Sequence, residues 1–232
     1  MTVIPFCASE AEVVAEHGDG TKTWRYETNR AGGILYAGDY VREEIQAGGL
    51  TIDFYYGRKH QAVMEAAGAA EAVRAVMDYC AGHYGSLAFG DGERLKLIQS
   101  RVAGGGYAGD GASLLDEADF TAHNLGDAGK GGGAAEVMIH ELVHQWWGLG
   151  NMFDTSDPTS PWSAEGLTVY TTYRIVKELY GADHAQEYYV DQWKREVEDY
   201  YLDFYVRNPE FLAKLPQEEQ LAISNSLSFI RQ

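Results

Sequence analysis

The most informative stretch of this 232-residue chain is HELVHQWWG, residues 140–148. On a helix, residues four positions apart lie one above the other, so His140 and His144 can present two imidazole nitrogens to one metal ion. Glu141 would then lie beside the metal rather than among its ligands. That position suits a general base that takes a proton from water. The plainer alternative is a helix with two packed histidines and a solvated glutamate.

A third ligand is expected downstream, and the best-placed candidate is Glu165 in WSAEG, residues 162–166. Two histidines and one carboxylate leave the fourth position open, which is the arrangement of catalytic zinc. Asp154 and Asp157 are alternative ligands in the polar loop 150–161. No Gly-x-x-His follows His144, which disfavours a three-histidine site. The pattern therefore predicts a catalytic rather than a structural metal site.

Over the rest of the chain, hydrophobic periodicity predicts both strands and helices. Short strands are expected at residues 24–28, 34–36, 50–55, 95–99 and 112–115, separated by glycine pairs and runs. Apolar residues at helical spacing predict a helix between His60 and Tyr84, another of about fifteen residues ending at Gly148, and a third from Trp162 to about Tyr180. The remainder is expected to be mostly helical, with its aromatic residues between 188 and 205 packed in a core.

Near residue 58 the sequence changes from strand-like segments to an Ala-rich stretch with helical spacing, which predicts a domain boundary there. A small antiparallel unit is expected before it, and the helical region that leads to the metal motif follows. The length is compatible with one large domain or with one domain and part of another. We therefore divide the chain into residues 1–58 and 59–232.

Composition excludes some partners. Thirty-five acidic residues against eighteen basic ones give a net charge of −17, which would repel nucleic acid over most of the surface. Cys7 and Cys80 form neither a metal knuckle nor a disulfide framework, and together with the absence of a signal peptide they favour the cytosol. No apolar run approaches the ~18–20 residues that span a bilayer. The chain is expected to be soluble, and its oligomeric state is left open.

The two motifs together resemble those of the gluzincin metallopeptidases related to membrane alanyl aminopeptidase and leukotriene hydrolase. In that family the zinc motif continues with an aromatic residue and glycine, and a distant Trp-x-x-Glu-Gly follows, as in residues 140–148 and 162–166. The resemblance covers mainly residues 85–180. It implies an α+β, thermolysin-like catalytic domain with a small mixed sheet and helices, and a hydrolase that cleaves peptides.

The resemblance also implies roles for individual residues. One Zn²⁺ per chain would be held by His140, His144 and Glu165, with Glu141 as the general base. An edge strand would lie over the cleft and bind the backbone of a peptide substrate, and we place it between Gly105 and Leu115. The predicted substrate-binding residues are Gly105, Gly106, Tyr107, Ala108, Gly109 and Asp110. A phosphate-binding reading of this glycine-rich run is disfavoured because no Lys-Ser/Thr follows it.

This sequence departs from the family pattern at the substrate site. Family aminopeptidases carry Gly-x-Met-Glu-Asn, whose glutamate binds the free amine of the substrate, and Ala108 occupies that position here. Strict aminopeptidase specificity is therefore in doubt, with Asp110 or Glu117 as candidate substitutes. The spacer of twenty residues between His144 and Glu165 is two residues longer than usual, which a surface loop tolerates.

A further departure concerns the end of the chain. The family places an oxyanion-stabilising tyrosine roughly sixty residues or more beyond the glutamate ligand, and no tyrosine follows Tyr205 here. Residues 1–58 would be only the last strands of the family's amino-terminal β domain. We therefore expect the chain to be an internal piece of a longer protein, which can contain membrane or further helical segments. Two alternatives to a zinc peptidase stay open: a non-catalytic peptide-binding or scaffold relative, and a hydrolase of a non-peptide substrate.

Overall fold

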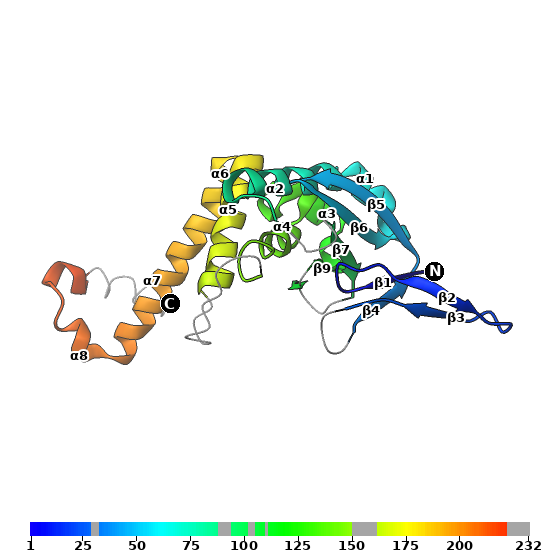
Figure 1. Ribbon diagram of the computed structural model, residues 1–232. Coiled ribbons are helices and arrows are strands. Elements are labelled where there is room, and N and C mark those ends of the chain that lie inside the picture. The colour runs from blue at the N-terminus through cyan, green and yellow to red at the C-terminus, as the bar shows by residue number, and fades with distance from the viewer. Residues whose placement is uncertain (29–32, 88–93, 102–104, 110, 150–161, 222–232) are drawn as a thin grey trace. The chain divides into compact units, whose positions relative to one another are not determined.

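The structure is a computed structural model (Figure 1). Its largest sheet among the described residues is mixed and has five strands. The structure describes residues 1–28, 33–87, 94–101, 105–109, 111–149 and 162–221. The strand order is β5-β6-β7-β9-β8. The strands are β5 (Tyr40–Ala47), β6 (Leu50–Gly57), β7 (Arg94–Ser100), β8 (Gly106–Gly109) and β9 (Ala112–Asp116). Together with the helices described below, this sheet confirms the predicted α+β class.

The topology follows from the turns and crossovers. Strands β5 and β6 form an antiparallel hairpin whose turn residues Gly48 and Gly49 both have positive φ, the conformation that two-residue hairpins require. Strands β6 and β7 are parallel, and the chain between them crosses through α1 (Gln61–Ala66) and α2 (Ala69–Tyr84). Strand β8 returns antiparallel to β9 and forms one edge of the sheet. The expected edge strand between Gly105 and Leu115 is thus present.

One face of the sheet is packed against helices. Side chains alternate along a strand, so Ile52 and Phe54 share a face, and both are fully buried. Helix α2 contacts β5 and also α4 (Glu136–Val143), which in turn contacts β8 and β9. The core residues of α2 are Ala69, Val73, Val76, Met77 and Cys80, at the spacing expected of a buried helical stripe.

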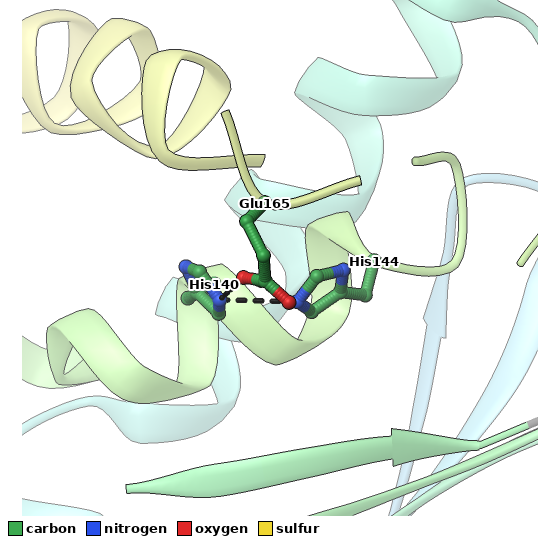
Figure 2. Close-up of side chains that lie close together, drawn as sticks. All are labelled: His140, His144 and Glu165. Carbon is green, nitrogen blue, oxygen red and sulfur yellow. Dashed lines mark hydrogen bonds and ion pairs between the residues drawn. The ribbon is translucent and has the colours of Figure 1, made fainter. Parts of the chain in front are cut away.

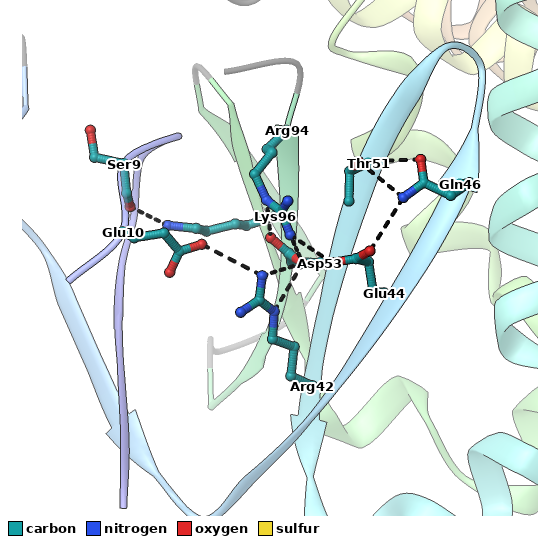
Figure 3. Close-up of polar contacts among 9 residues, drawn as sticks. All are labelled: Ser9, Glu10, Arg42, Glu44, Gln46, Thr51, Asp53, Arg94 and Lys96. Atoms are coloured by element: carbon teal, nitrogen blue, oxygen red, sulfur yellow. Dashed lines mark hydrogen bonds and ion pairs between the residues drawn. The ribbon is translucent and has the colours of Figure 1, made fainter. Parts of the chain in front are cut away.

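The opposite face is covered by the amino-terminal segment. Ile4 packs with Tyr55, Ile98 and Leu114 in one buried cluster. Beside it, the buried Asp53 accepts hydrogen bonds from the guanidinium groups of Arg42 and Arg94 (Figure 3). The ammonium group of Lys96, also fully buried, donates to the backbone carbonyl of Ser9. We call Asp53, Arg42, Arg94 and Lys96 the outer-face network.

Four further strands form two separate pairs. The strand β1 (Thr2–Pro5) is antiparallel to β4 (Leu35–Gly38), and β2 (Glu12–Glu16) is antiparallel to β3 (Lys22–Arg25). The predicted division at residue 58 stays a prediction. Strands from both sides of it, β6 and β7, are nevertheless neighbours in the central sheet.

Shorter helical turns connect the strands to the longer helices. They are η1 (Arg58–His60), η2 (Glu117–Asp119), α3 (Ala122–Leu125), η3 (Ala128–Lys130), η4 (Gly132–Ala134) and the π-helical turn η5 (Trp162–Gly166). Helix α5 (Leu167–Tyr180) follows η5 and contacts α4. The described chain therefore has the helix that was predicted from Trp162 to about Tyr180.

The chain divides into two compact units, residues 1–184 and 185–232. After α6 (Ala182–Ala185), the second unit contains η6 (Gln186–Val190), α7 (Asp191–Arg207) and α8 (Pro209–Leu212). The predicted core role of its aromatic residues is wrong for Tyr200 and Tyr201, which are 69% and 55% exposed. Helix α7 buries none of its residues, although it contacts η6 and α8. No helix among the described residues is long and apolar enough to cross a membrane.

Candidate metal centre

The helix that carries the two histidines is shorter than the sequence predicted. It runs from Glu136 to Val143, rather than over about fifteen residues to Gly148. Beyond Val143 the backbone tightens, since the amides of Gln145 and Trp146 bond to carbonyls three residues back. The chain then turns at Gly148, whose φ of +94° favours glycine.

A glycine cluster makes room for the start of this helix. Gly131 has a φ of +92°, and a Cβ placed there would lie 2.4 Å from the amide nitrogen of Glu136. A side chain at this position would thus clash with the first turn of α4. The cluster at residues 129–133 therefore positions the helix and its histidines.

His140, His144 and Glu165 converge at one point (Figure 2). The two Nε2 atoms are 3.0 Å apart, and Glu165 Oε2 lies 3.3 Å from that of His140 and 3.4 Å from that of His144. A tetrahedral zinc centre with bonds of about 2.0–2.1 Å separates its ligand atoms by about 3.3 Å. The three side chains thus fit a metal ion of this kind. The alternative ligands Asp154 and Asp157 lie outside the described residues.

The ring of His144 is held in one orientation. Its Nδ1 lies 3.0 Å from the carbonyl oxygen of Trp147 and 3.2 Å from the hydroxyl of Thr168. An Nδ1 proton donated to that carbonyl leaves the Nε2 lone pair free for a metal. The pKa of His140 is lowered by burial first and by His144 second, which favours the neutral imidazole that a metal needs.

Glu141 lies beside this group and is only 5% exposed. Burial, and secondarily the negative charge of Glu165, raise its pKa to about 8. A cation held by the three ligands would lower that pKa again. The alternative of a solvated glutamate is therefore wrong.

The edge strand β8 lies next to Glu141. A Cβ at Gly106 would lie 2.4 Å from the Cγ of Glu141, so only glycine permits this approach. Gly106, Tyr107 and Ala108 line a cavity of about 340 Å³ together with the histidines, Glu141 and Glu165. The ring of Tyr107 itself lies near Phe6, with 5.8 Å between ring centroids. Of the predicted substrate-binding residues, Asp110 lies outside the described residues.

Three polar residues that the motif did not predict hold the helix and strands together. The buried Gln145 donates to the carbonyl of Gly109 and to the hydroxyl of Ser113. Ser113 donates in turn to the backbone carbonyl of Glu141. Thr168, one turn after Glu165, contacts His144 as described above. Gln145 and Thr168 lie beside or one turn from a motif residue, whereas Ser113 lies in a strand 28 positions before Glu141 and has no such signal.

Glu117, one candidate for the missing amine-binding carboxylate, is engaged elsewhere. Its two oxygens bind Lys59 and Arg101, each at 2.8 Å, and His60 at 3.3 Å. The bond from Lys59 is the largest cause that lowers the pKa of Glu117, to about 2. The prediction that Glu117 takes the place of the family glutamate therefore has no support in its contacts.

Residues 120–207 match the model of the peptidase family M1 domain. This match includes both motifs, and it supports the resemblance drawn from them. No curated protein matches the chain significantly.

Solved structures similar to the chain are M1 zinc metallopeptidases. One from Deinococcus radiodurans has 17% identity and a TM-score of 0.46, over 83% of this chain and 42% of that protein. A mutant from the same organism, bound to a Tyr-Ser-Ala substrate, has 20% identity and a TM-score of 0.48, over 83% and 43%. A two-domain mutant bound to L-tryptophan has 19% identity and a TM-score of 0.48, over 83% of this chain and 43% of that protein. The chain thus spans less than half the length of these proteins.

Proposed function

We propose that this chain is the zinc-binding catalytic part of a peptidase that cleaves peptide bonds with an activated water molecule. The observation that carries the proposal is the convergence of three ligand atoms beside a buried glutamate and the edge of a sheet. The match to the family M1 domain over residues 120–207 supports the same class of reaction.

Each residue has a defined task in this mechanism. His140, His144 and Glu165 would hold the metal, and bound zinc supplies a Lewis acid that polarises a carbonyl and makes water easier to deprotonate. Glu141 accepts the proton of the attacking water and can pass it to the leaving amine. The free edge of β8 can pair with an extended peptide through backbone hydrogen bonds.

The test of this proposal is the Glu141→Gln variant. We expect one zinc per chain in both proteins, and a loss of peptide hydrolysis of about 10²–10⁴-fold in the variant, since the amide cannot accept the proton. Metal analysis and a fluorogenic peptide assay measure the two quantities. The assay includes the full-length protein as well as this chain. Full activity in the variant would exclude Glu141 as the base, and zinc binding with peptide affinity but without hydrolysis would favour a non-catalytic relative.

We further propose that cleavage does not depend on a free amino terminus. Among the described residues that line the cavity at β8, the only carboxylates are Glu141 and Glu165, which have other tasks. A substrate ammonium group would therefore lack its own charged partner there. Free and N-acetylated forms of one peptide are expected to give kcat/KM values within about threefold. A preference of a hundredfold or more for the free amine would show that another carboxylate takes the place of the glutamate missing at Ala108.

A further inference from the structure

A second cavity, of about 550 Å³, lies away from the metal centre at the carboxyl ends of the parallel strands β6 and β7. Gly57 and Ser100, the last residues of these strands, both line it. Ligands of open α/β sheets commonly bind beyond the carboxyl ends of the strands. One wall of this cavity is aromatic, because Tyr36 and Tyr40 line it and pack against the buried cluster around Ile4.

Two buried polar groups in this lining have no hydrogen-bond partner among the described residues. Gln99 is 2% exposed; its Oε1 accepts from the amide of Gly57 at 3.0 Å, whereas its Nε2 has no partner. The hydroxyl of the next residue, Ser100, also has none. An unpaired buried donor costs free energy, and each such group needs an explanation. A ligand that accepts hydrogen bonds from both would provide one.

The carboxylates of this cavity are already used. Glu117 binds Lys59 and Arg101 through different oxygens, and both oxygens of Asp39 accept from the guanidinium of Arg58. The lysine and arginine at Glu117 keep further N–H groups that can donate. The hydrogen-bonding capacity that remains is therefore mainly that of donors.

The local charge has the opposite sign to that of the whole protein. In the lining, Lys59 and Arg101 offset Asp39 and Glu117, and Arg58, which pairs with Asp39 from outside the lining, adds one positive charge, while the chain as a whole carries −17. One excess positive charge suits a monoanion better than a doubly charged phosphate. The aromatic wall suits a flat apolar body.

We propose that this cavity is a binding site for a small organic carboxylate with a planar apolar body. The carboxylate accepts hydrogen bonds from the Gln99 amide and the Ser100 hydroxyl, after small shifts of these side chains bring the donors to the ligand. Arg101 provides positive charge at the rim. The body lies against Tyr36 and Tyr40. This site is independent of the proposed peptidase activity, because it shares no residue with the metal centre.

Titration of the chain with benzoate, followed by two-dimensional ¹H–¹⁵N NMR, tests this site. We expect saturable shifts of the side-chain NH₂ signals of Gln99 and of the backbone amides near Ser100. Benzamide, a neutral molecule of the same shape, and inorganic phosphate are expected to bind at least tenfold more weakly. Equal binding of either would overturn the proposed chemistry.

Two variants locate the binding. Ser100→Ala removes one donor, and Arg101→Gln removes an 82% exposed charge without disturbing the core. Each is expected to weaken benzoate binding about tenfold, which is typical for a hydrogen bond to a charged group. Arg74→Gln, the same charge change on the exposed face of α2, is the control and should bind as the unchanged chain does. Binding that persists undiminished in both variants places benzoate elsewhere, including at the metal, and overturns the proposal.

Discussion

The outer-face network and the metal centre are two polar clusters on opposite faces of one sheet. They differ in how their donors and acceptors are paired. In the network, the buried carboxylate of Asp53 faces the guanidinium groups of Arg42 and Arg94, which also pair with Glu10 and Glu44, so donors meet acceptors (Figure 3). In the metal centre, two imidazole nitrogens and a carboxylate oxygen, all acceptors towards a cation, point at one another (Figure 2). A cluster whose charges already compensate needs no ligand, whereas a cluster of converging acceptors needs a cation from outside.

Removing the charge of Asp53 should have the largest effect on stability. The Asp53→Asn variant leaves Arg42, Arg94 and the buried Lys96 with too little compensating charge, which we expect to lower the free energy of unfolding by about 3 kcal/mol. Urea denaturation measures it. Glu44→Gln, a 54% exposed partner of Arg94, is the control and should cost less than about 1 kcal/mol. Equal losses in the two variants would show that burial does not distinguish Asp53.

A change at Gly106 should have the converse effect, with activity lost and stability kept. The Cβ of Gly106→Ala would displace Glu141. We expect kcat/KM to fall about a hundredfold, since a misplaced base of this kind loses about 2.7 kcal/mol of transition-state stabilisation. Zinc content should be unchanged. Gly82→Ala, where an added Cβ meets nothing within 4 Å, is the control. Unaltered kinetics in Gly106→Ala would mean that β8 does not fix the glutamate.

The smallest expected effect concerns the pH dependence of stability. Burial lowers the pKa of Lys96 below its ordinary value of 10.5. The unfolded chain therefore holds that proton more tightly, and the free energy of unfolding rises with pH between the lowered pKa and about 10.5. In Lys96→Met this contribution should be absent. Chemical denaturation of both proteins at several pH values compares the slopes, and parallel curves would contradict the shift.

The metal centre could be predicted almost completely from sequence, because its spacing is local. His140 and His144 lie one helical turn apart, and Glu165 follows in a motif with its own aromatic and glycine signals. The length of the helix could not be predicted in this way. Its hydrophobic pattern continues to Trp147, but the backbone hydrogen bonds change after Val143, and composition does not show where that happens.

The outer-face network shows what sequence patterns miss. Strand β5 escaped prediction because the charged run of Arg42, Glu43 and Glu44 hides its alternation. In the folded chain, Arg42 and Glu44 both take part in the contacts around Asp53 and Arg94. Their partners lie 11 and 50 positions away, and only the sheet register brings them together. Long-range pairings of this kind leave no periodic signal.

The bond from Lys96 to Ser9 also constrains the order in which the chain can fold. The two residues are 87 positions apart, and the segment around Ser9 covers strands that follow it in the sequence. During synthesis this segment leaves the ribosome before β7 and β9, and it cannot cover them until they exist. Ile4, 1% exposed in the folded protein, lacks its partners Ile98 and Leu114 for that time. The segment around Ser9 is therefore made before the strands it covers but is buried only after them.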